Sequence, residues 1–378
     1  MLKRGKFWIV LVSLGLLLLA DSCSTGIGTI DSPQVPVIYC TDLFHPYDDP
    51  DDHFDIAALY ALEELDIQGI VLDQGKKQDL KPGRIPVEQI NYMTGRDVPY
   101  AIGLSEPLGS TDDKALDEPD RYQNGVRMIL DILEGSQDPV TIITVGSLRD
   151  VVAAFNRRPD LFRERVSRLI IFIGEASAGT REWNVDLDPN AFIRIMNSGL
   201  PVWWIPCFDG GNFKNRGNAS FWKAPHADLF KYASDQVMNF FIYALLKKDL
   251  PDYLGFLEDE VDERDRDQVI SEVRNLWCAA VFTEAAGRKI IKKDAGWASV
   301  PGCYPSEETQ VCEVFRFVPI DVYVDNKARV VYQDKDRSHQ IFRFQIINLE
   351  SYPEIMTSVT SHLIGDIKKR NGTEPGVY

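Results

Sequence analysis

Hydrophobic and polar positions along the chain follow two alternating patterns. Short apolar runs rich in β-branched residues and bounded by polar turns are typical of strands buried in a sheet. These runs lie at residues 37–40, 67–72, 140–145, 169–173 and 202–207. Segments with apolar residues at helical spacing lie at 55–65, 87–93, 121–133, 148–155 and 190–196. The alternation predicts an α/β fold with a mostly parallel sheet flanked by helices, a Rossmann-like core.

The last third of the chain has a different pattern. Its predicted elements are a helix at 269–285, strands at 314–324, 328–332 and 341–346, and a helix at 352–369. The turn sequence Asp325-Asn326-Lys327 between two of these strands indicates a β hairpin. We therefore expect one domain, residues 36–370, with a small C-terminal β hairpin.

The N-terminal segment has the pattern of an export signal. Lys3, Arg4 and Lys6 precede an apolar run at 7–20, which is short for a membrane-spanning helix. The sequence Leu19-Ala20-Asp21-Ser22-Cys23 resembles a lipobox, although Asp21 is unusual there. We expect a signal at 1–22, lipidation of Cys23 and a tether at 23–35. The protein is thus expected in the bacterial periplasm or as a lipoprotein that contacts the membrane only through its anchor. Plain secretion and an uncleaved anchor are the alternatives.

Composition limits the partners. The 378 residues include 41 Lys and Arg against 57 Asp and Glu, a formal net charge of −16, and no basic stripe interrupts the acidity. This charge argues against nucleic acid and leaves a small molecule as the expected partner, with homo-oligomerisation open. Export permits disulfides, so Cys303 and Cys312 either form a bridge or remain free thiols.

Acidic residues crowd the segment after the first predicted strand. They are Asp42, Asp48, Asp49, Asp51, Asp52 and Asp55. Two like charges about 4 Å apart repel by about 4 kcal/mol at an effective dielectric near 20. A hard cation such as Ca²⁺ would relieve that repulsion. The alternative is that these aspartates cap helices and turns and face water. His45 and His53 in the same segment are either further ligands or surface residues, and we expect the surface.

Several motifs in this order resemble the inosine/uridine-preferring nucleoside hydrolase family. They are Thr41-Asp42, Asp51-Asp52 before an Ala/Leu-rich helix, the segment 90–107 with Gly95-Arg96, the segment 141–150, and Glu182-Trp183-Asn184 followed by Asp188-Pro189. The similarity covers roughly residues 35–350. It implies the nucleoside-hydrolase fold and hydrolysis of the N-glycosidic bond of ribonucleosides or a related N-riboside.

The resemblance also implies roles for individual residues. Asp42 matches the catalytic base, which deprotonates a water held on Ca²⁺. The implied metal ligands are Asp42, Asp52 and the Val145 carbonyl; the implied ribose ligands are Asp51, Glu182 and Asn184. Carboxylates suit this reaction because positive charge develops on the sugar ring as the bond breaks. Phe54 and Trp183 either shield the site and stack on a base or pack in the core.

Three positions depart from the family pattern. Cys40 replaces the first aspartate of the signature, Asp73-Gln74-Gly75 stands where a Gly-Asn pair is usual, and Trp277-Cys278 stands where a His-Asp pair is expected. The missing aspartate is a metal ligand in the family, and cysteine is a poor ligand for Ca²⁺. Asp48 or Asp49 is the expected compensation. Without the histidine, His226 or a water is the expected leaving-group acid.

Two other functions remain open on the sequence. One is a non-catalytic ribose- or nucleoside-binding protein on the same fold, which Ca²⁺ affinity and loss of activity in Asp42→Ala would separate from an enzyme. The other is a glycosidase acting on another sugar with Asp42 and Glu182 as paired carboxylates. Product analysis with sugars and nucleosides would separate it.

Overall fold

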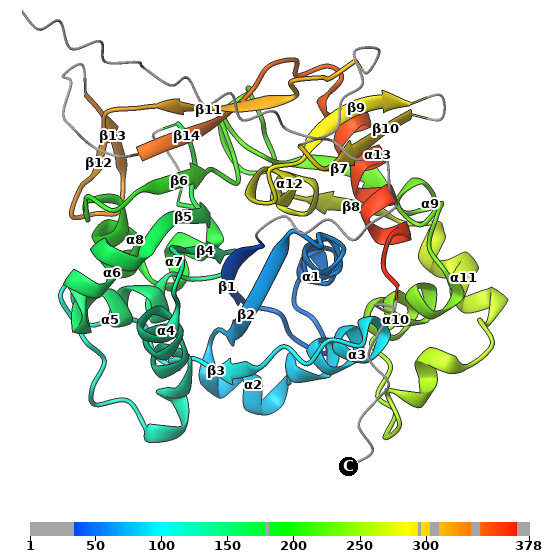
Figure 1. Ribbon diagram of the computed structural model, residues 1–378, viewed down its shortest axis with the longest axis horizontal. Coiled ribbons are helices and arrows are strands. Elements are labelled where there is room, and N and C mark those ends of the chain that lie inside the picture. The colour runs from blue at the N-terminus through cyan, green and yellow to red at the C-terminus, as the bar shows by residue number, and fades with distance from the viewer. Residues whose placement is uncertain (1–33, 178–180, 294–295, 303–309, 334–340, 369–378) are drawn as a thin grey trace, which may run out of the picture. The chain divides into compact units, whose positions relative to one another are not determined.

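The central element is an eight-stranded sheet (Figure 1). The computed structural model describes residues 34–177, 181–293, 296–302, 310–333 and 341–368, and these described residues belong to one compact unit. The sheet strands are β1 (Val35–Thr41), β2 (Leu65–Leu72), β3 (Tyr100–Ile102), β4 (Val140–Thr144), β5 (Val166–Phe172), β6 (Val202–Ile205), β11 (Phe315–Pro319) and β14 (Ile341–Ile346). Their order is β11-β14-β6-β5-β4-β1-β2-β3.

All pairings in this sheet are parallel except that of the edge strand β11 with β14. The predicted mostly parallel α/β fold is therefore confirmed. The chain moves outward from β1 through β2 to β3, and then returns to the other side of β1 at β4. The carboxyl ends of β1 and β4 thus form a topological switch point, where open parallel sheets bind ligands.

Helices cover both faces of the sheet (Figure 1). One face carries α1 (Asp51–Tyr60), α3 (Arg84–Thr94), α10 (Asp235–Leu245) and α13 (Tyr352–Gly365). The other carries α4 (Asn124–Gly135), α5 (Arg149–Arg157), α6 (Pro159–Arg165) and α8 (Pro189–Met196). Each set buries its own hydrophobic cluster against the strands. This arrangement explains why the strands are nearly continuous apolar runs.

The expected helix at 269–285 is wrong. This region contains α11 (Glu263–Ile270), β8 (Val273–Leu276), a short 3-10 turn (Ala279–Val281) and α12 (Phe282–Ala285). Strand β8 pairs with β7 (Trp222–Pro225) in an antiparallel ladder. Every residue from 276 to 283 is buried. The apolar spacing therefore reflects burial on all sides and not one face of an amphipathic helix.

Other boundaries differ in smaller ways. Helix α1 begins at Asp51, before the predicted 55, and ends at Tyr60 because β2 already begins at Leu65. The segment 314–324 divides into β11 and β12 (Val322–Val324), and β12 forms the predicted hairpin with β13 (Val330–Tyr332).

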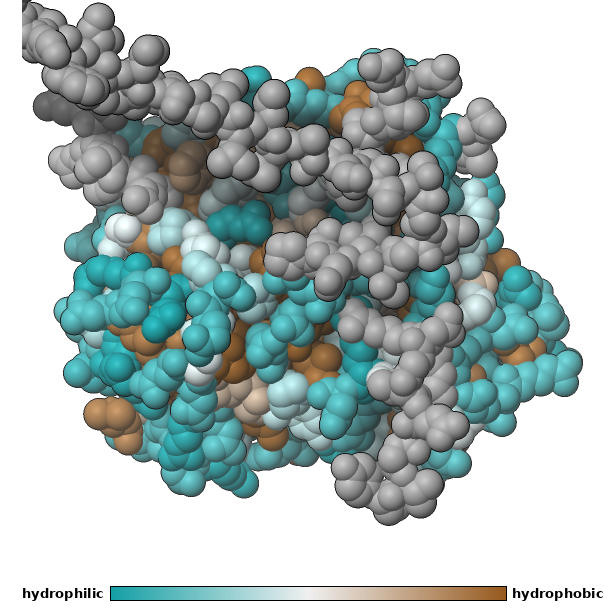
Figure 2. All heavy atoms as spheres, in the orientation of Figure 1, coloured by the Kyte–Doolittle hydropathy of each residue, from teal (hydrophilic) through white to brown (hydrophobic). Residues whose placement is uncertain are grey.

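Further short elements connect the main ones. They are α2 (Gly75–Leu80), α7 (Trp183–Leu187), α9 (His226–Leu229), 3-10 turns at Asp120–Tyr122 and Gly255–Glu258, and the antiparallel pair β9 (Lys289–Lys293) and β10 (Gly296–Val300). On the face shown in Figure 2, hydrophilic side chains predominate and hydrophobic ones form small separate areas. No helix within the described ranges is long and apolar enough to cross a bilayer.

Candidate active site

A pocket of about 470 Å³ lies at the carboxyl ends of β1, β4, β5 and β6. Its walls bring together all six residues that the sequence analysis singled out for catalysis, substrate and metal: Asp42, Asp51, Asp52, Val145, Glu182 and Asn184. The other lining residues are Asp48, Asp49, Phe172, Arg181, Trp183, Asp186, Cys207, Phe208, Asn212, Phe213, Trp277 and Cys278. The roles assigned to the six remain predictions.

The end of β1 orders the first acids of the site. The Thr41 hydroxyl donates a hydrogen bond of 2.7 Å to Asp52 and accepts one of 3.1 Å from the Leu43 amide. Asp42 follows directly, and its Oδ2 lies 3.5 Å from the side-chain nitrogen Nε2 of Gln74. A Cβ on Gly146 would lie 3.1 Å from Asp42 Oδ1, so the glycine lets the loop after β4 approach Asp42 closely.

Asp51 and Asp52 form the first turn of α1, where the positive end of the helix dipole favours negative charge. Burial nevertheless raises the pKa of both well above the usual range, and neighbouring carboxylates raise it further. Burial, and then the charge of Asp73, raise the pKa of Asp42 to about 8. The three acids therefore share one poorly solvated space, in which a cation would be strongly favoured.

Glu182 and Asn184 are fixed by the start of α7. Glu182 is the N-cap residue, and its two carboxylate oxygens accept hydrogen bonds from the Asn184 amide (2.9 Å) and the Gly174 amide (2.8 Å). The Asn184 side-chain amide donates to the Val145 carbonyl at 2.9 Å. This bond ties α7 to the end of β4. It leaves Asn184 Oδ1 and a second lone pair on the Val145 carbonyl for a ligand.

The donor set suits a hard cation in its chemistry. Asp42, Asp51, Asp52 and the Val145 carbonyl supply oxygen atoms to one pocket, and the raised carboxylate pKa values indicate that little protein positive charge offsets them. As the side chains lie, however, no three His, Cys, Asp or Glu groups in the described ranges converge closely enough to hold an ion. The ligand set implied by the family resemblance contains two carboxylates and a backbone carbonyl, Asp42, Asp52 and Val145, and all three border the pocket.

Cys278 lies in this pocket and beside Asp55. Asp55 accepts a hydrogen bond of 2.9 Å from the Ala279 amide and also interacts with the Cys278 thiol. Burial and the nearby acids raise the pKa of Cys278. Cys40, by contrast, packs in the apolar cluster on the α4 and α5 face. Only one of the two cysteines that replace family aspartates therefore borders the pocket.

The longer loop provides limited compensation for Cys278. Asp48 and Asp49 both border the pocket. Asp48 forms ion pairs with Lys77 and Lys81, which compete with a metal for its oxygens. Asp49 is exposed at the surface.

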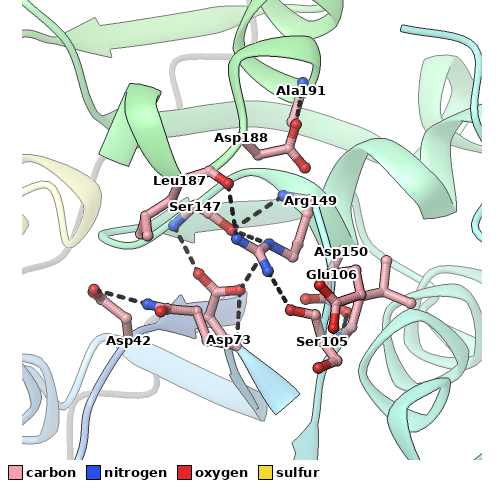
Figure 3. Close-up of polar contacts among 12 residues, drawn as sticks. Asp42, Asp73, Ser105, Glu106, Ser147, Arg149, Asp150, Leu187, Asp188 and Ala191 are labelled. Atoms are coloured by element: carbon pink, nitrogen blue, oxygen red, sulfur yellow. Dashed lines mark hydrogen bonds and ion pairs between the residues drawn. The ribbon is translucent and has the colours of Figure 1, made fainter. Parts of the chain in front are cut away.

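A buried ion-pair network behind Asp42 escaped the sequence analysis (Figure 3). Arg149 at the start of α5 lies 3.5 Å from Asp73, and both side chains are almost fully buried. The guanidinium also donates to the Ser147 hydroxyl and to the Ser105 and Leu187 carbonyls. The second oxygen of Asp73 accepts from the Ser147 amide at 2.9 Å. The network joins the ends of β2 and β4 beneath the pocket; nothing in the spacing of these residues indicates that they meet.

Aromatic side chains form the outer part of the pocket. Trp183 and Phe213 are 62% and 57% exposed, whereas Phe208 and Trp277 are buried behind them. The Phe208 ring centroid lies 5.3 Å from Phe213 and 5.9 Å from Trp277. Core packing is thus the wrong alternative for Trp183. It is the right one for Phe54, which is fully buried against Phe230 and Phe241.

The histidines do not behave as expected. His45 and His53 are buried, not at the surface, because the ring of His45, in the loop after β1, packs against Tyr243, and that of His53, in α1, packs against Phe240. His226 is fully buried, and its ring contacts the Val269 carbonyl and the Arg274 guanidinium. It does not line the pocket, so His226 as leaving-group acid is wrong.

Two predictions about cysteines fall outside the described residues. The lipidation residue Cys23 lies in residues 1–33, and Cys303 lies in 303–309. Cys312, its proposed disulfide partner, is a half-buried residue of the described part of the chain.

Comparison with protein families gives one match that covers more than half of the chain. The sequence model of the inosine-uridine preferring nucleoside hydrolase family matches residues 46–248. The matched segment includes all the lining residues of the pocket except Asp42, Trp277 and Cys278.

Curated relatives agree over part of their length. The pyrimidine-specific ribonucleoside hydrolase RihA of Citrobacter koseri is 28% identical over 188 residues, which are 44% of this chain and 58% of the relative. RihA of an Escherichia coli O1:K1 strain is 28% identical over 172 residues, 40% and 55% of the two chains. The chain thus aligns with little more than half the length of these relatives.

Solved structures agree in fold. The plant nucleoside hydrolase PpNRh1 has a TM-score of 0.52 at 12% identity, covering 88% of this chain and 99% of the other. The inosine-uridine preferring nucleoside hydrolase of Bacillus anthracis has a TM-score of 0.50 at 14% identity, covering 88% and 100%.

Proposed function

Because the chain belongs to the inosine-uridine preferring nucleoside hydrolase family, we propose that it hydrolyses the N-glycosidic bond of ribonucleosides or related N-ribosides. The observation that carries the proposal is the gathering of Asp42, Asp51, Asp52, Glu182 and Asn184 in one pocket at the switch point of the sheet. A surface cluster of helix caps would not enclose such a cavity.

The chain's own residues divide the work between proton transfer and ribose binding. Asp42 takes the proton of the attacking water, and the Gln74 amide and the loop at Gly146 hold its carboxylate in place. Asp51 and Asn184 Oδ1 accept hydrogen bonds from ribose hydroxyls. Glu182 keeps α7 in position through its cap and retains lone pairs for a further ribose hydroxyl. The surrounding negative charge stabilises the cationic sugar ring of the transition state.

We propose Ca²⁺ as the cofactor, held by Asp42, Asp52 and the Val145 carbonyl. When bound, the ion would lower the pKa of the attacking water and fix the sugar. The oxygen donors and their crowding support this assignment, and Cys278 weakens it because a thiol is a poor ligand for a hard cation.

The test is ribose release from uridine and inosine by the purified protein, with Ca²⁺ and after chelation. We expect turnover with Ca²⁺ and a loss of at least about 100-fold in kcat for Asp42→Asn, because proton transfer to a positioned base contributes about that much or more. Glu258→Gln, a change at an exposed residue outside the pocket lining, is the matched control. Unchanged kcat in Asp42→Asn would contradict the assignment of the base.

A second function is favoured by Cys278, because a thiol borders the pocket where the family resemblance implies a carboxylate ligand for the metal. It is nucleoside binding without hydrolysis. Calorimetric binding of uridine or inosine without ribose release, at any Ca²⁺ concentration, would identify it.

A further inference from the structure

The pocket combines acidic side chains with an aromatic rim. Seven of its described lining residues are Asp or Glu, and Arg181 is the one basic residue among the described lining residues. Arg181 is itself paired with Asp186 at 2.8 Å. Asp48 is paired with Lys77 and Lys81, and a cation held by Asp42 and Asp52 would offset their charge, so Asp49, Asp51 and Glu182 remain as uncompensated acids of the lining. The pocket therefore remains favourable for a substrate that carries positive charge.

Apart from its carboxyl groups, the described lining of the pocket provides no ordinary proton donor for a leaving base. No His, Lys or Tyr is among the described lining residues, and residues 178–180 are Ala, Gly and Thr. Arg181 does not release its proton at working pH. Glu182 uses both oxygens as acceptors of backbone N–H groups, and Asp186 accepts from Arg181. We therefore expect slow departure of a neutral purine or pyrimidine that must be protonated as its glycosidic bond breaks.

The exposed rings at the rim supply a surface for a flat cation. Trp183 and Phe213 leave more than half of their area to solvent although they border the pocket, and Phe213 is braced by Phe208 and Phe221 at 5.3 and 6.0 Å. Faces of Trp and Phe attract a cation placed over them, and Trp does so most strongly. A charged aromatic base would cover these rings while its ribose reaches the acids below.

We propose that the preferred substrates are ribosides of a permanently charged aromatic base, such as N-ribosylpyridinium compounds. This inference rests on the proposed hydrolase function and specifies its substrate class. Water oxygen forms the new bond to C1′, and the bond between C1′ and the pyridinium nitrogen breaks with its electron pair passing to nitrogen. The base leaves as a neutral pyridine. The one proton that is released comes from the water and passes through Asp42 to solvent, so no acid is required.

The test compares β-N-ribosyl-3-carbamoylpyridinium, uridine and inosine as substrates of the full chain, with spontaneous hydrolysis subtracted. We expect kcat/KM to be at least about tenfold higher for the pyridinium riboside, with the lowest KM of the three. The neutral 1,4-dihydropyridine riboside has nearly the same shape, and we expect it to bind more weakly in calorimetry than the cation. This comparison separates charge recognition from the intrinsic reactivity of the pyridinium.

Trp183→Leu provides the residue-level test. It should raise the KM of the pyridinium riboside by about 2-fold to 30-fold, the range of a single cation–π contact, and change the KM of uridine less. Tyr92→Leu removes an exposed ring outside the pocket lining and should change neither.

Each result decides the proposal. The expected preference, lost in part in Trp183→Leu, supports it. Equal or better hydrolysis and binding of uridine or inosine would overturn it and leave the proposed hydrolase function standing. Release of ribose from none of the three would overturn both.

Discussion

At the scale of the residue, the acids of the site differ in the partners that stabilise their charge. Asp52 accepts a hydrogen bond from the Thr41 hydroxyl, Glu182 caps helix α7, and Asp48 forms ion pairs with two lysines. Asp42 and Asp51 lie close to other carboxylates, and burial and these neighbours raise the pKa of both. Burial raises the pKa of Asp52 as well, so a cation in the pocket would stabilise the ionised form of all three acids.

Cys278 allows a direct test of the cation. Changing Cys278→Asp adds a hard oxygen ligand beside Asp51 and Asp55, so we expect calcium affinity to increase by about tenfold or more. Isothermal titration with Ca²⁺ measures the change. Cys40→Asp places an acid in the apolar cluster on the other face of the sheet and should destabilise the fold without improving binding. No gain in affinity for Cys278→Asp would argue against a metal next to this thiol.

The pH dependence of stability should reflect buried acids away from the pocket. Burial raises the pKa of Asp150 to about 7, and its oxygen accepts from the Leu104 amide at 3.0 Å. Between the unfolded pKa near 4 and the folded value, the folded chain holds a proton that the unfolded chain has lost. The free energy of unfolding therefore falls as pH rises from about 4 to 7. The decrease is about 1.4 kcal/mol per pH unit within this range.

Asp150→Asn removes this titration and keeps an acceptor for Leu104. Urea unfolding at several pH values should show a smaller loss of stability toward pH 8 than in the unchanged protein. Asp138→Asn, an exposed loop residue, is the control. A pH profile that is the same in Asp150→Asn and the unchanged chain would contradict the argument.

At the scale of the element, the loops after the strands are held by side chains that cap helices. Asp188 accepts from the Ala191 amide at 2.9 Å as the N-cap of α8 and from the Leu108 amide at 2.8 Å. One carboxylate thus joins the loop after β3 to the helix that follows α7. The position of α7, and with it Asn184, depends on such contacts.

Asp188→Ala should lower the free energy of unfolding by about 2 to 4 kcal/mol, since it removes a cap and leaves the buried Leu108 amide without an acceptor. Ser234→Ala removes only the cap of α10, which accepts from the Val237 amide, and should cost about 1 kcal/mol. Urea denaturation measures both. Equal losses would show that the Leu108 bond contributes nothing.

At the scale of the whole molecule, the sequence of the N-terminal segment leads us to propose an exported, tethered protein. Residues 1–33 lie outside the described part of the chain, so we propose export and lipidation from their sequence alone. Expression in a bacterium with labelled fatty acid should label the protein. Cys23→Ser should abolish the label, and Cys312→Ser should not. Retained label in Cys23→Ser would refute the lipobox assignment.

The sequence by itself determined the architecture and the acids of the site. Apolar runs that alternate with helical periods require a parallel sheet covered on both faces, and Asp42, Asp51 and Asp52 lie close together in the chain, so local order suffices to gather them. The sequence also identified Glu182 and Asn184, because they belong to the Glu182-Trp183-Asn184 motif at the start of α7.

Only the tertiary structure decided which residues from distant segments meet these acids. The partnership of Arg149 with Asp73, the exposure of Trp183 and the burial of His45, His53 and His226 depend on long-range packing, which no local periodicity encodes. The helix expected at 269–285 was wrong for the same reason. A run that is buried on every side carries no sign of which neighbours surround it, so its backbone is set by the pairing of β8 with β7.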